Sequence, residues 1–473
     1  MNPPEIIRLS EEMAGLDLGD ARLNRRSRRL LETLSHHPDR SIPTACRGWA
    51  ETKAAYRLFD HEAVTAQKLL EPHYRCTTER MMSHDTVLCI QDSTELDYTG
   101  KNDIEGLGTL NYEHRRGLYL HPTLAVTPDR LPLGLLDCWT WTRPFVDADK
   151  ESVRWLEGYQ RLCEAQQYLW EQAADTHLVY IADREGDLFP IYTEHRDQSD
   201  RGVHAADWLI RAQHDRRTAE GARLWASVEA SVPLGSVEFV LPAARTESTA
   251  AATTATAALT PLRRGRRITQ SLRALRVTLL PPEGHAERTP VEVTAILARE
   301  EHPAPGQAPI EWLLLTNLPV QTLEQAQEKL SWYLCRWQIE IYFRVLKSGC
   351  KIEELQLEKL ERLEPALALY MLIAWRVLYL TMIGRDCPEL PASLVFADEE
   401  WRAIYLVSTH RPPPDTPPSI NEIIRMVAGF GGFLNRNADG MPGPQTIWIG
   451  LQRCKDFVLA LEAQAAASES GCG

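Results

Sequence analysis

The segment SWYLCRWQIEIYFRVLK carries four side chains whose types and spacing suit work on a phosphate backbone. Tyr333, Arg336, Glu340 and Lys347 are offset by 0, 3, 7 and 14 residues. On a helix running through 322–347 they would form one narrow polar stripe about 21 Å long. A lone acid flanked by hydroxyl, guanidinium and ammonium groups over that length suits an extended polyanion better than a small substrate. An exposed face laced with salt bridges is the alternative interpretation.

An apolar stripe beside the polar one predicts how this helix is held. Leu334, Trp337, Ile341 and Val345 recur at helical spacing. Such a stripe typically faces a core, so we expect the helix to pack by this side.

Two further acids end short apolar segments that are typical of buried strands. Asp92 ends TVLCIQD and Asp183 ends HLVYIAD. The carboxyl end of a buried strand opens onto the edge of a sheet, where sites in α/β proteins form. Carboxylate oxygens are the ligands that Mg²⁺ prefers, so the pair favours a metal site. A turn former or a cap is the alternative interpretation for either aspartate taken alone.

The distribution of charge decides whether a nucleic acid is a plausible ligand. The 473 residues have a formal net charge of −13, which at first argues against one. However, residues 1–75 carry a net +1 and residues 208–280 a net +6, so the remainder carries −20. Two arginine clusters lie in these segments: Arg22, Arg25, Arg26, Arg28 and Arg29, then Arg263, Arg264, Arg266, Arg267, Arg273 and Arg276. Arginine grips phosphate oxygens in pairs, although a solvated surface is the alternative interpretation.

The elements that must position these residues can be read in order. We expect short helices at the start, with Asp20 as a cap, then a mixture of strands and helices, and then helices to the end. The Ala/Thr-rich stretch 249–260 indicates a loose loop. Strands are predicted at 86–92, 117–128, 131–143, 177–183, 207–214 and 312–319, a helix at 148–174, a β-rich insertion at 215–310, and helices after 351 with breaks at 411–418 and 429–433.

Composition excludes several classes of protein. Hydrophobic residues make up 44% and charged residues 25%, which excludes disorder as the dominant state. We expect no membrane-spanning segment, because no run of about 18 apolar residues stands out. The ten cysteines lack the spacing of a zinc site. With no export signal expected at the N-terminus, they are predicted to be buried or incidental thiols in a reducing cytoplasm.

Together these residues resemble the DDE transposases of bacterial insertion sequences, in the insertion-sequence-four family. The signature of that family is Tyr-(2)-Arg-(3)-Glu-(6)-Lys, which Tyr333, Arg336, Glu340 and Lys347 match at every spacing. QDSTEL is similar to the strand end with the first catalytic aspartate, and IADREGD to the motif with the second. LGDARLNRR and AAYRLFDH resemble the family's N-terminal domain, and DEEWRAI and GGFLNR its C-terminal domain.

The resemblance implies a fold and a domain plan. We expect an α/β fold with an RNase H-like catalytic core, a β-rich insertion, and helical domains at both ends. The implied domains are a DNA-binding domain at 1–75, a catalytic domain at 76–370 with its insertion at about 215–310, and a dimerisation domain at 371–473.

The resemblance also implies the chemistry. Asp92, Asp183 and Glu340 would be the catalytic acids, holding two Mg²⁺ or Mn²⁺ ions. The reaction series would be nicking of the element's ends, hairpin formation and opening, and strand transfer into target DNA. The expected partners are double-stranded DNA and a second copy of the chain, with no membrane, in the cytoplasm of a bacterium. The residues implied in DNA binding are Tyr333, Arg336, Lys347, Trp312, Arg22, Arg25, Arg26 and Arg211.

Three alternatives remain at this point. A core tryptophan is the alternative role for Trp312. For the whole chain, the alternatives are a non-catalytic DNA-binding remnant and an RNase H-like nuclease without strand transfer.

Overall fold

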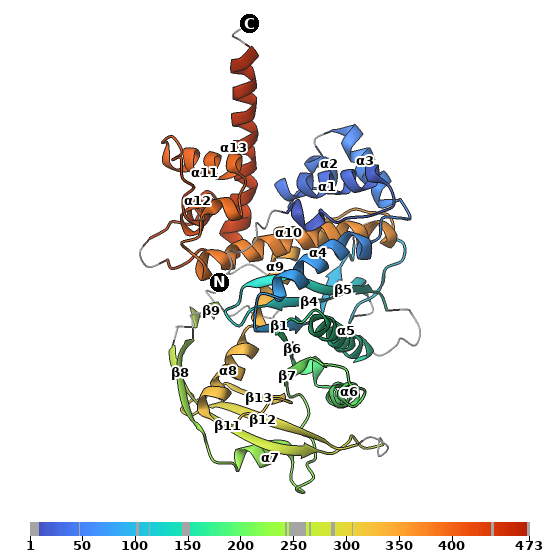
Figure 1. Cartoon of the computed structure of the whole chain (residues 1–473), viewed down its shortest axis with the longest axis vertical. Helices are drawn as coiled ribbons and strands as arrows, with labels where there is room; N and C mark the ends of the chain where they lie inside the picture. The colour runs from blue at the N-terminus through green and yellow to red at the C-terminus, as the bar shows by residue number, and fades with distance from the viewer. Residues whose placement is uncertain are drawn as a thin grey trace, which may run out of the picture. The chain divides into compact units, whose positions relative to one another are not determined.

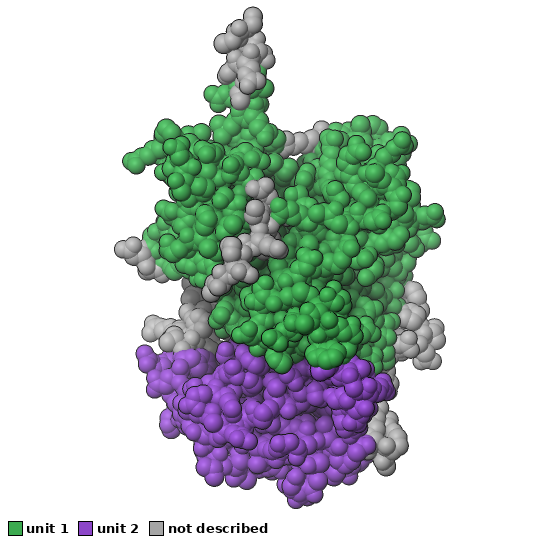
Figure 2. All heavy atoms as spheres, viewed as in Figure 1, with its two compact units in different colours: residues 1–178, 335–473 green, residues 179–334 purple. Residues whose placement is uncertain are grey.

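The computed structural model divides into two compact units, coloured separately in Figure 2. Unit 1 comprises Met1–Leu178 and Cys335–Gly473, and unit 2 comprises Val179–Leu334. The structure describes residues 9–470 except 47, 101–103, 113, 144–151, 242–243, 246–261, 264–265, 285–288, 305 and 437–438. The Ala/Thr-rich stretch 249–260 therefore lies outside the described residues, as does Arg264.

Unit 1 begins with the helices that the sequence predicts. In α1, Asp20 Oδ1 accepts a hydrogen bond from the Arg22 N–H at 2.7 Å, which confirms the expected cap. Leucines face inward along α1 and the arginines lie on the other side. The elements of this part are η1 (Glu11–Met13), α1 (Ala21–His36), α2 (Ile42–Ala45), α3 (Trp49–Phe59) and α4 (Ala66–Met81).

A buried charged network ties this helical region to a strand. Glu12 is 2% exposed and accepts hydrogen bonds from Arg80 Nη1 at 2.8 Å and from His73 Nδ1. His73 Nε2 in turn accepts the backbone N–H of Leu135 at 3.0 Å. The network links η1, α4 and β5, so the first helices are held on the sheet by satisfied polar groups.

The strands of unit 1 form an antiparallel sheet around β4. Both β1 and β2 pair with β4, and Asp92 lies in the gap between them. Opposite this gap is Pro122, which has no N–H to donate, so the ladder is interrupted where Asp92 sits. The elements are β1 (Thr86–Gln91), β2 (Thr94–Asp97), β3 (Gly108–Thr109), β4 (Arg116–Val126), β5 (Pro132–Trp141) and α5 (Ser152–Glu171).

The C-terminal part of unit 1 is helical, as the sequence predicts. Helix α10 is apolar on all sides and packs against α1, α3, α4, α12, α13 and β5 (Figure 1). The elements are α9 (Trp337–Arg344), a wide π turn η3 (Val345–Gly349), η4 (Ile352–Glu354), α10 (Leu360–Asp386), η5 (Ala392–Leu394), α11 (Asp398–Thr409), α12 (Ile420–Phe430) and α13 (Pro444–Ser470).

Helix α10 corrects one expectation. By length and composition it passes the test for a membrane-spanning helix, although the sequence reading found no such segment. However, 94% of its most apolar window is buried inside the protein. A core helix passes the same test, so α10 is weak evidence for a membrane.

Unit 2 is built on a mixed sheet. Strand β6 (His177–Ala182), which begins in unit 1, pairs in parallel with β7, and the remaining pairs follow antiparallel in the order β7, β13, β12, β11, β8. The helices α6 and α7 were not expected. The elements are η2 (Arg184–Gly186), α6 (Phe189–Asp200), β7 (Asp207–Arg211), α7 (Leu224–Glu229), β8 (Gly235–Leu241), β9 (Ala244–Arg245), β10 (Leu262–Arg263), β11 (Arg266–Leu279), β12 (Val291–Glu300), β13 (Glu311–Thr316) and α8 (Leu323–Leu334).

The predicted continuous helix over 322–347 is wrong. A turn at 335–336 separates α8 from α9, and the π turn η3 widens the coil from Val345 onward. The apolar stripe fails with it, because Trp337 is 50% exposed. Of the predicted stripe only Val345 is buried, and the other buried side chains of this segment are Trp332, Tyr333, Cys335, Arg336, Gln338, Ile339, Tyr342, Phe343 and Leu346.

The predicted domain limits stay a prediction. Helix α4 runs across residue 75 and α10 across residue 370.

Candidate active site

In unit 1 one arginine joins two of the predicted catalytic acids. Arg336 Nη1 lies 3.2 Å from Asp92 Oδ2, and Arg336 Nη2 donates to Glu340 Oε1 at 2.6 Å. The Arg336 side chain is 5% exposed, that of Asp92 18% and that of Glu340 42%. A guanidinium this deeply buried needs carboxylates close by, so the contact explains why Arg336 points inward.

Chain geometry accounts for this convergence. Asp92 stands in the gap between β1 and β2, where its Oδ1 also accepts the backbone N–H of Ser93 at 2.8 Å. Arg336 precedes the first residue of α9, and Glu340 follows one turn later on the same face. An acid in the first turn of a helix is favoured by the helix dipole.

In unit 2 the second predicted acid has its own partners. Asp183 follows β6 and accepts the hydroxyl of Tyr333 at Oδ1, 3.1 Å away. Arg211 Nη1, from the end of β7, lies 3.5 Å from the same oxygen. The parallel pairing of β6 with β7 brings the two strand ends to one edge, as expected for a parallel pair.

Lys347 does not join the carboxylates of Asp92 or Glu340 in the recorded contacts. Its ammonium group donates to the backbone carbonyl of Glu95 and lies 3.8 Å from Glu353 Oε1. The π turn changes the angular position of Lys347, so the stripe calculated for a regular helix does not place it correctly. Sequence reasoning missed both partners. Glu95 lies within QDSTEL but contributes a backbone carbonyl, and Glu353 carries no motif that sets it apart from other acids.

Trp312 lies at the start of β13, opposite Ala298 in the register. Its side chain is only partly buried, which disfavours the interpretation as a core tryptophan.

The first arginine cluster lines a groove. Arg22, Arg25 and Arg26 are exposed on α1. With Arg29 they border a groove of about 430 Å³ whose other wall is α3. Several guanidinium groups along one groove suit a phosphate backbone.

The arginines of the second cluster form ion pairs and hydrogen bonds within unit 2. Arg266 pairs with Glu300, Arg267 with Glu238 and Arg276 with Glu292, all within the sheet of unit 2. Arg273 donates to the backbone carbonyl of Ser231. These four arginines therefore balance local acids and carbonyls, which favours the structural interpretation over a DNA-binding patch.

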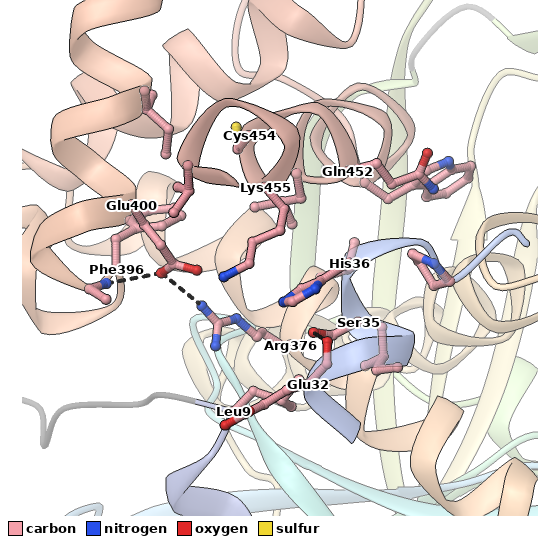
Figure 3. Close-up of a pocket in the computed structure, with 18 of the residues that line it drawn as sticks. Leu9, Glu32, Ser35, His36, Arg376, Phe396, Glu400, Gln452, Cys454 and Lys455 are labelled. Atoms are coloured by element: carbon pink, nitrogen blue, oxygen red, sulfur yellow. Dashed lines mark hydrogen bonds and ion pairs between the residues drawn. The ribbon is translucent and has the colours of Figure 1, made fainter. Parts of the chain in front are cut away.

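Another cavity, of about 350 Å³, lies among α1, α10, α11 and α13 (Figure 3). Arg376 lies 3.9 Å from Glu400 there, and Glu400 also accepts the N–H of Ala397 at 2.9 Å. Glu32, Glu399 and Lys455 complete its charged lining. Acids outnumber bases, so this cavity is poorly suited to phosphate.

The donor set suits a hard divalent cation only in part. Asp92 and Glu340 both face one positive group, the Arg336 guanidinium, so their oxygens converge as metal ligands must. Among the described residues, no group of three or more His, Cys, Asp or Glu side chains stands out as a metal site. The nine cysteines in the described part of the chain form no disulfide with one another, and six of them are buried.

Three family models match the chain in succession. A model described as "Transposase DNA-binding" matches residues 9–64, and "Transposase DDE domain" matches residues 171–376. "Transposase Tn5 dimerisation domain" matches residues 372–473. The DDE match contains Asp183 and the whole signature segment but not Asp92.

These matches agree with the mixed sheet and the helical regions on either side of it, and they identify an RNase H-like catalytic fold. They also identify a DNA-binding region and a dimerisation region. The chain therefore belongs to the Tn5-like DDE transposases.

Proposed function

We propose that this chain moves an insertion sequence by cutting and joining DNA through metal-dependent phosphoryl transfer. The proposed series is nicking at the element's ends, hairpin formation, hairpin opening and strand transfer. The observation that carries it is the buried Arg336, which holds Asp92 and Glu340 toward one point. Two carboxylates brought close together support a cleavage site, because metal ions need converging oxygen ligands.

We assign the metal ligands to Asp92, Asp183 and Glu340. Two divalent cations, Mg²⁺ or Mn²⁺, would when bound activate the attacking oxygen and stabilise the leaving oxygen of an in-line displacement. The Tyr333 hydroxyl donates to Asp183 and so orients its carboxylate. Arg211 supplies positive charge beside the same oxygen, where a phosphate would approach.

The remaining signature side chains act on the DNA. Lys347, whose side chain is 28% exposed, has the charge to hold a phosphate beside the break. Arg336, which is buried and paired with Asp92 and Glu340, would act on the DNA by fixing these two carboxylates. Trp312, partly exposed, would stack on a base extruded when the backbone bends into a hairpin. Arg22, Arg25 and Arg26 would bind the backbone of the end sequence along the α1–α3 groove.

The match to a dimerisation domain supports the assembly of two copies. We propose that the synaptic complex is a homodimer, acting on DNA in the cytoplasm of a bacterium. Sedimentation of the protein with and without end DNA tests this assembly; a complex with a single copy would contradict it.

The decisive experiment uses duplex DNA carrying the terminal inverted repeats that flank the gene. With Mg²⁺, the wild-type chain should nick, form hairpins and join ends to a target. Glu340→Gln should abolish every chemical step while end binding stays within about 3-fold, because it removes a carboxylate and not a backbone contact.

Glu328→Gln is the matched control, since Glu328 lies on α8 and contacts only Lys329 among its recorded partners. It should cleave at the wild-type rate. Cleavage by Glu340→Gln at a near-normal rate would overturn the site assignment. End binding without any cleavage by the wild type would favour a DNA-binding remnant, and cleavage without joining would favour a simple nuclease.

A further inference from the structure

A second aspartate in the loop after β6 is buried and takes no part in the chemistry proposed above. Asp187 is 1% exposed. Its Oδ1 accepts the hydroxyl of Tyr192, on α6, at 2.6 Å and a hydrogen bond from Arg216 Nη2. The same guanidinium nitrogen donates to the backbone carbonyl of Asp187 at 2.8 Å. Burial and the nearby Asp187 raise the pKa of Tyr192, so its hydroxyl stays protonated and donates.

The other carboxylate oxygen of Asp187 binds the chain beyond β7. Asp187 Oδ2 accepts the backbone N–H groups of Gln213 at 2.6 Å and of His214 at 2.8 Å. These residues follow Arg211 and Ala212 directly. One carboxylate therefore fixes the segment after β7 to the segment after β6, with four donors around it.

The link from Asp187 back to Asp183 is short and rigid. The two aspartates bracket the single turn η2, in which the Gly186 N–H bonds to the Asp183 carbonyl at 3.0 Å. The Asp187 N–H bonds to the Arg184 carbonyl at 3.1 Å. Asp183 Oδ1 caps the same turn by accepting the Arg184 N–H at 2.8 Å. A displacement of Asp187 is therefore passed to Asp183 through a closed hydrogen-bonded turn.

We propose that Asp187 is a positioning residue that holds Asp183 and Arg211 in their working geometry by clamping the ends of β6 and β7 together. The inference rests on the proposed function, because Asp183 is there a metal ligand. An asparagine at 187 cannot replace the whole clamp, because it keeps one acceptor oxygen and its NH2 group would face either the N–H groups of residues 213 and 214 or the guanidinium of Arg216. Partners that orient a metal ligand typically contribute about 10- to 100-fold in metal affinity or activity.

The test measures steady-state cleavage of end DNA over a range of DNA concentrations and, separately, Mn²⁺ binding by electron paramagnetic resonance. Asp187→Asn should lower kcat by about 30- to 100-fold and weaken Mn²⁺ binding by about 10-fold, with KM for DNA within 2-fold. Tyr192→Phe removes one of the four donors and should lower kcat by about 3- to 10-fold. This milder variant keeps the test usable if Asp187→Asn does not fold.

Asp215→Asn is the matched control, because Asp215 lies in the same segment and its Oδ1 accepts only the Trp225 N–H among its recorded hydrogen bonds. It should leave kcat and Mn²⁺ binding within 2-fold of wild type. A purely structural role for Asp187 predicts fewer folded molecules with normal kcat and normal Mn²⁺ affinity per folded molecule, and that result would overturn the proposal. If the wild type cleaves nothing, the proposed function fails, while the Mn²⁺ titration still decides whether Asp187 positions Asp183.

Discussion

Replacing Arg336 with glutamine tests whether the buried guanidinium holds the site together. The change keeps a polar side chain but shortens it by two bonds and removes the charge between Asp92 and Glu340. We expect unit 1 to lose about 2 kcal/mol of unfolding free energy, measured in EDTA. Removing one partner of a fully buried ion pair costs about 3–5 kcal/mol, and the loss here is smaller because Glu340 is 42% exposed and can turn to water.

The two carboxylates should not contribute equally. Glu340 is the nearer to the guanidinium, at 2.6 Å against 3.2 Å for Asp92. Asp92 is the more buried, at 18% against 42% exposed, so its charge is screened less by water. Exposed pairs one helical turn apart contribute about 0.3–0.5 kcal/mol. We therefore expect burial to outweigh distance, with a coupling of about 1–2 kcal/mol to Asp92 and about 0.5 kcal/mol to Glu340.

Two double-mutant cycles measure these couplings. One combines Arg336→Gln with Asp92→Asn and the other combines it with Glu340→Gln, each followed by urea unfolding with circular dichroism and fluorescence. Coincident transitions from the two probes are needed before a free energy is assigned. The reasoning fails if Arg336→Gln unfolds like the wild type, or if the coupling to Glu340 exceeds that to Asp92.

Three further predictions concern pH and DNA. Burial, with a smaller contribution from Arg154, lowers the pKa of His121 to about 3 from 6.5. The folded protein therefore gains no penalty from His121 above pH 6.5, and its stability falls as acid protonates the unfolded chain. In urea unfolding, the wild type should lose about 2 kcal/mol of unfolding free energy relative to His121→Gln between pH 6.5 and 5. Equal dependence of the two free energies on pH would exclude this role. Trp312→Ala should reduce hairpin yield on denaturing gels by about 10- to 100-fold and Trp312→Phe much less, whereas equal losses would exclude stacking. Arg25→Ala and Arg26→Ala should each lower the slope of log affinity against log salt by about 1 in fluorescence-anisotropy titrations; an unchanged slope would place these side chains off the DNA.

Arg28 supplies the control for the α1 predictions. Its guanidinium donates to the carbonyls of Met13 at 3.0 Å and Ala14 at 2.7 Å, so it holds η1 against α1. Arg28→Ala should lower the melting temperature and leave the salt slope unchanged.

The sequence predicted helices and strands correctly where their formation depends on residues close by in the chain. The buried run before Asp92, the strand before Asp183 and the cap at Asp20 each depend on neighbours within a few residues, and all three are confirmed. The signature segment failed as a helix because its geometry depends on distant partners. Tyr333 and Arg336 turn inward to reach carboxylates that lie far away in the sequence.

The two arginine clusters also show what the local sequence can and cannot predict. Counting arginines located two clusters, but only the contacts distinguish them. The α1 arginines border an open groove, whereas Arg266, Arg267 and Arg276 face acids on neighbouring strands. Strand register decides that pairing, and register is set by the whole sheet and not by the local sequence. The clamp at Asp187 was invisible for the same reason, because its partners are backbone groups beyond β7.

Because α10 packs against elements made much earlier, the chain cannot complete the core of unit 1 until late in synthesis. Leu360–Asp386 fills the space against α1, α3, α4 and β5, although it is made more than 200 residues after them. Contacts between such distant segments form slowly, because a long loop must close first. As the ribosome extends the chain, the first helices therefore present uncovered apolar surface until α10 emerges, and aggregation competes with folding during that interval. A chaperone that binds exposed apolar segments should act on the nascent chain before residue 386 and release it afterwards.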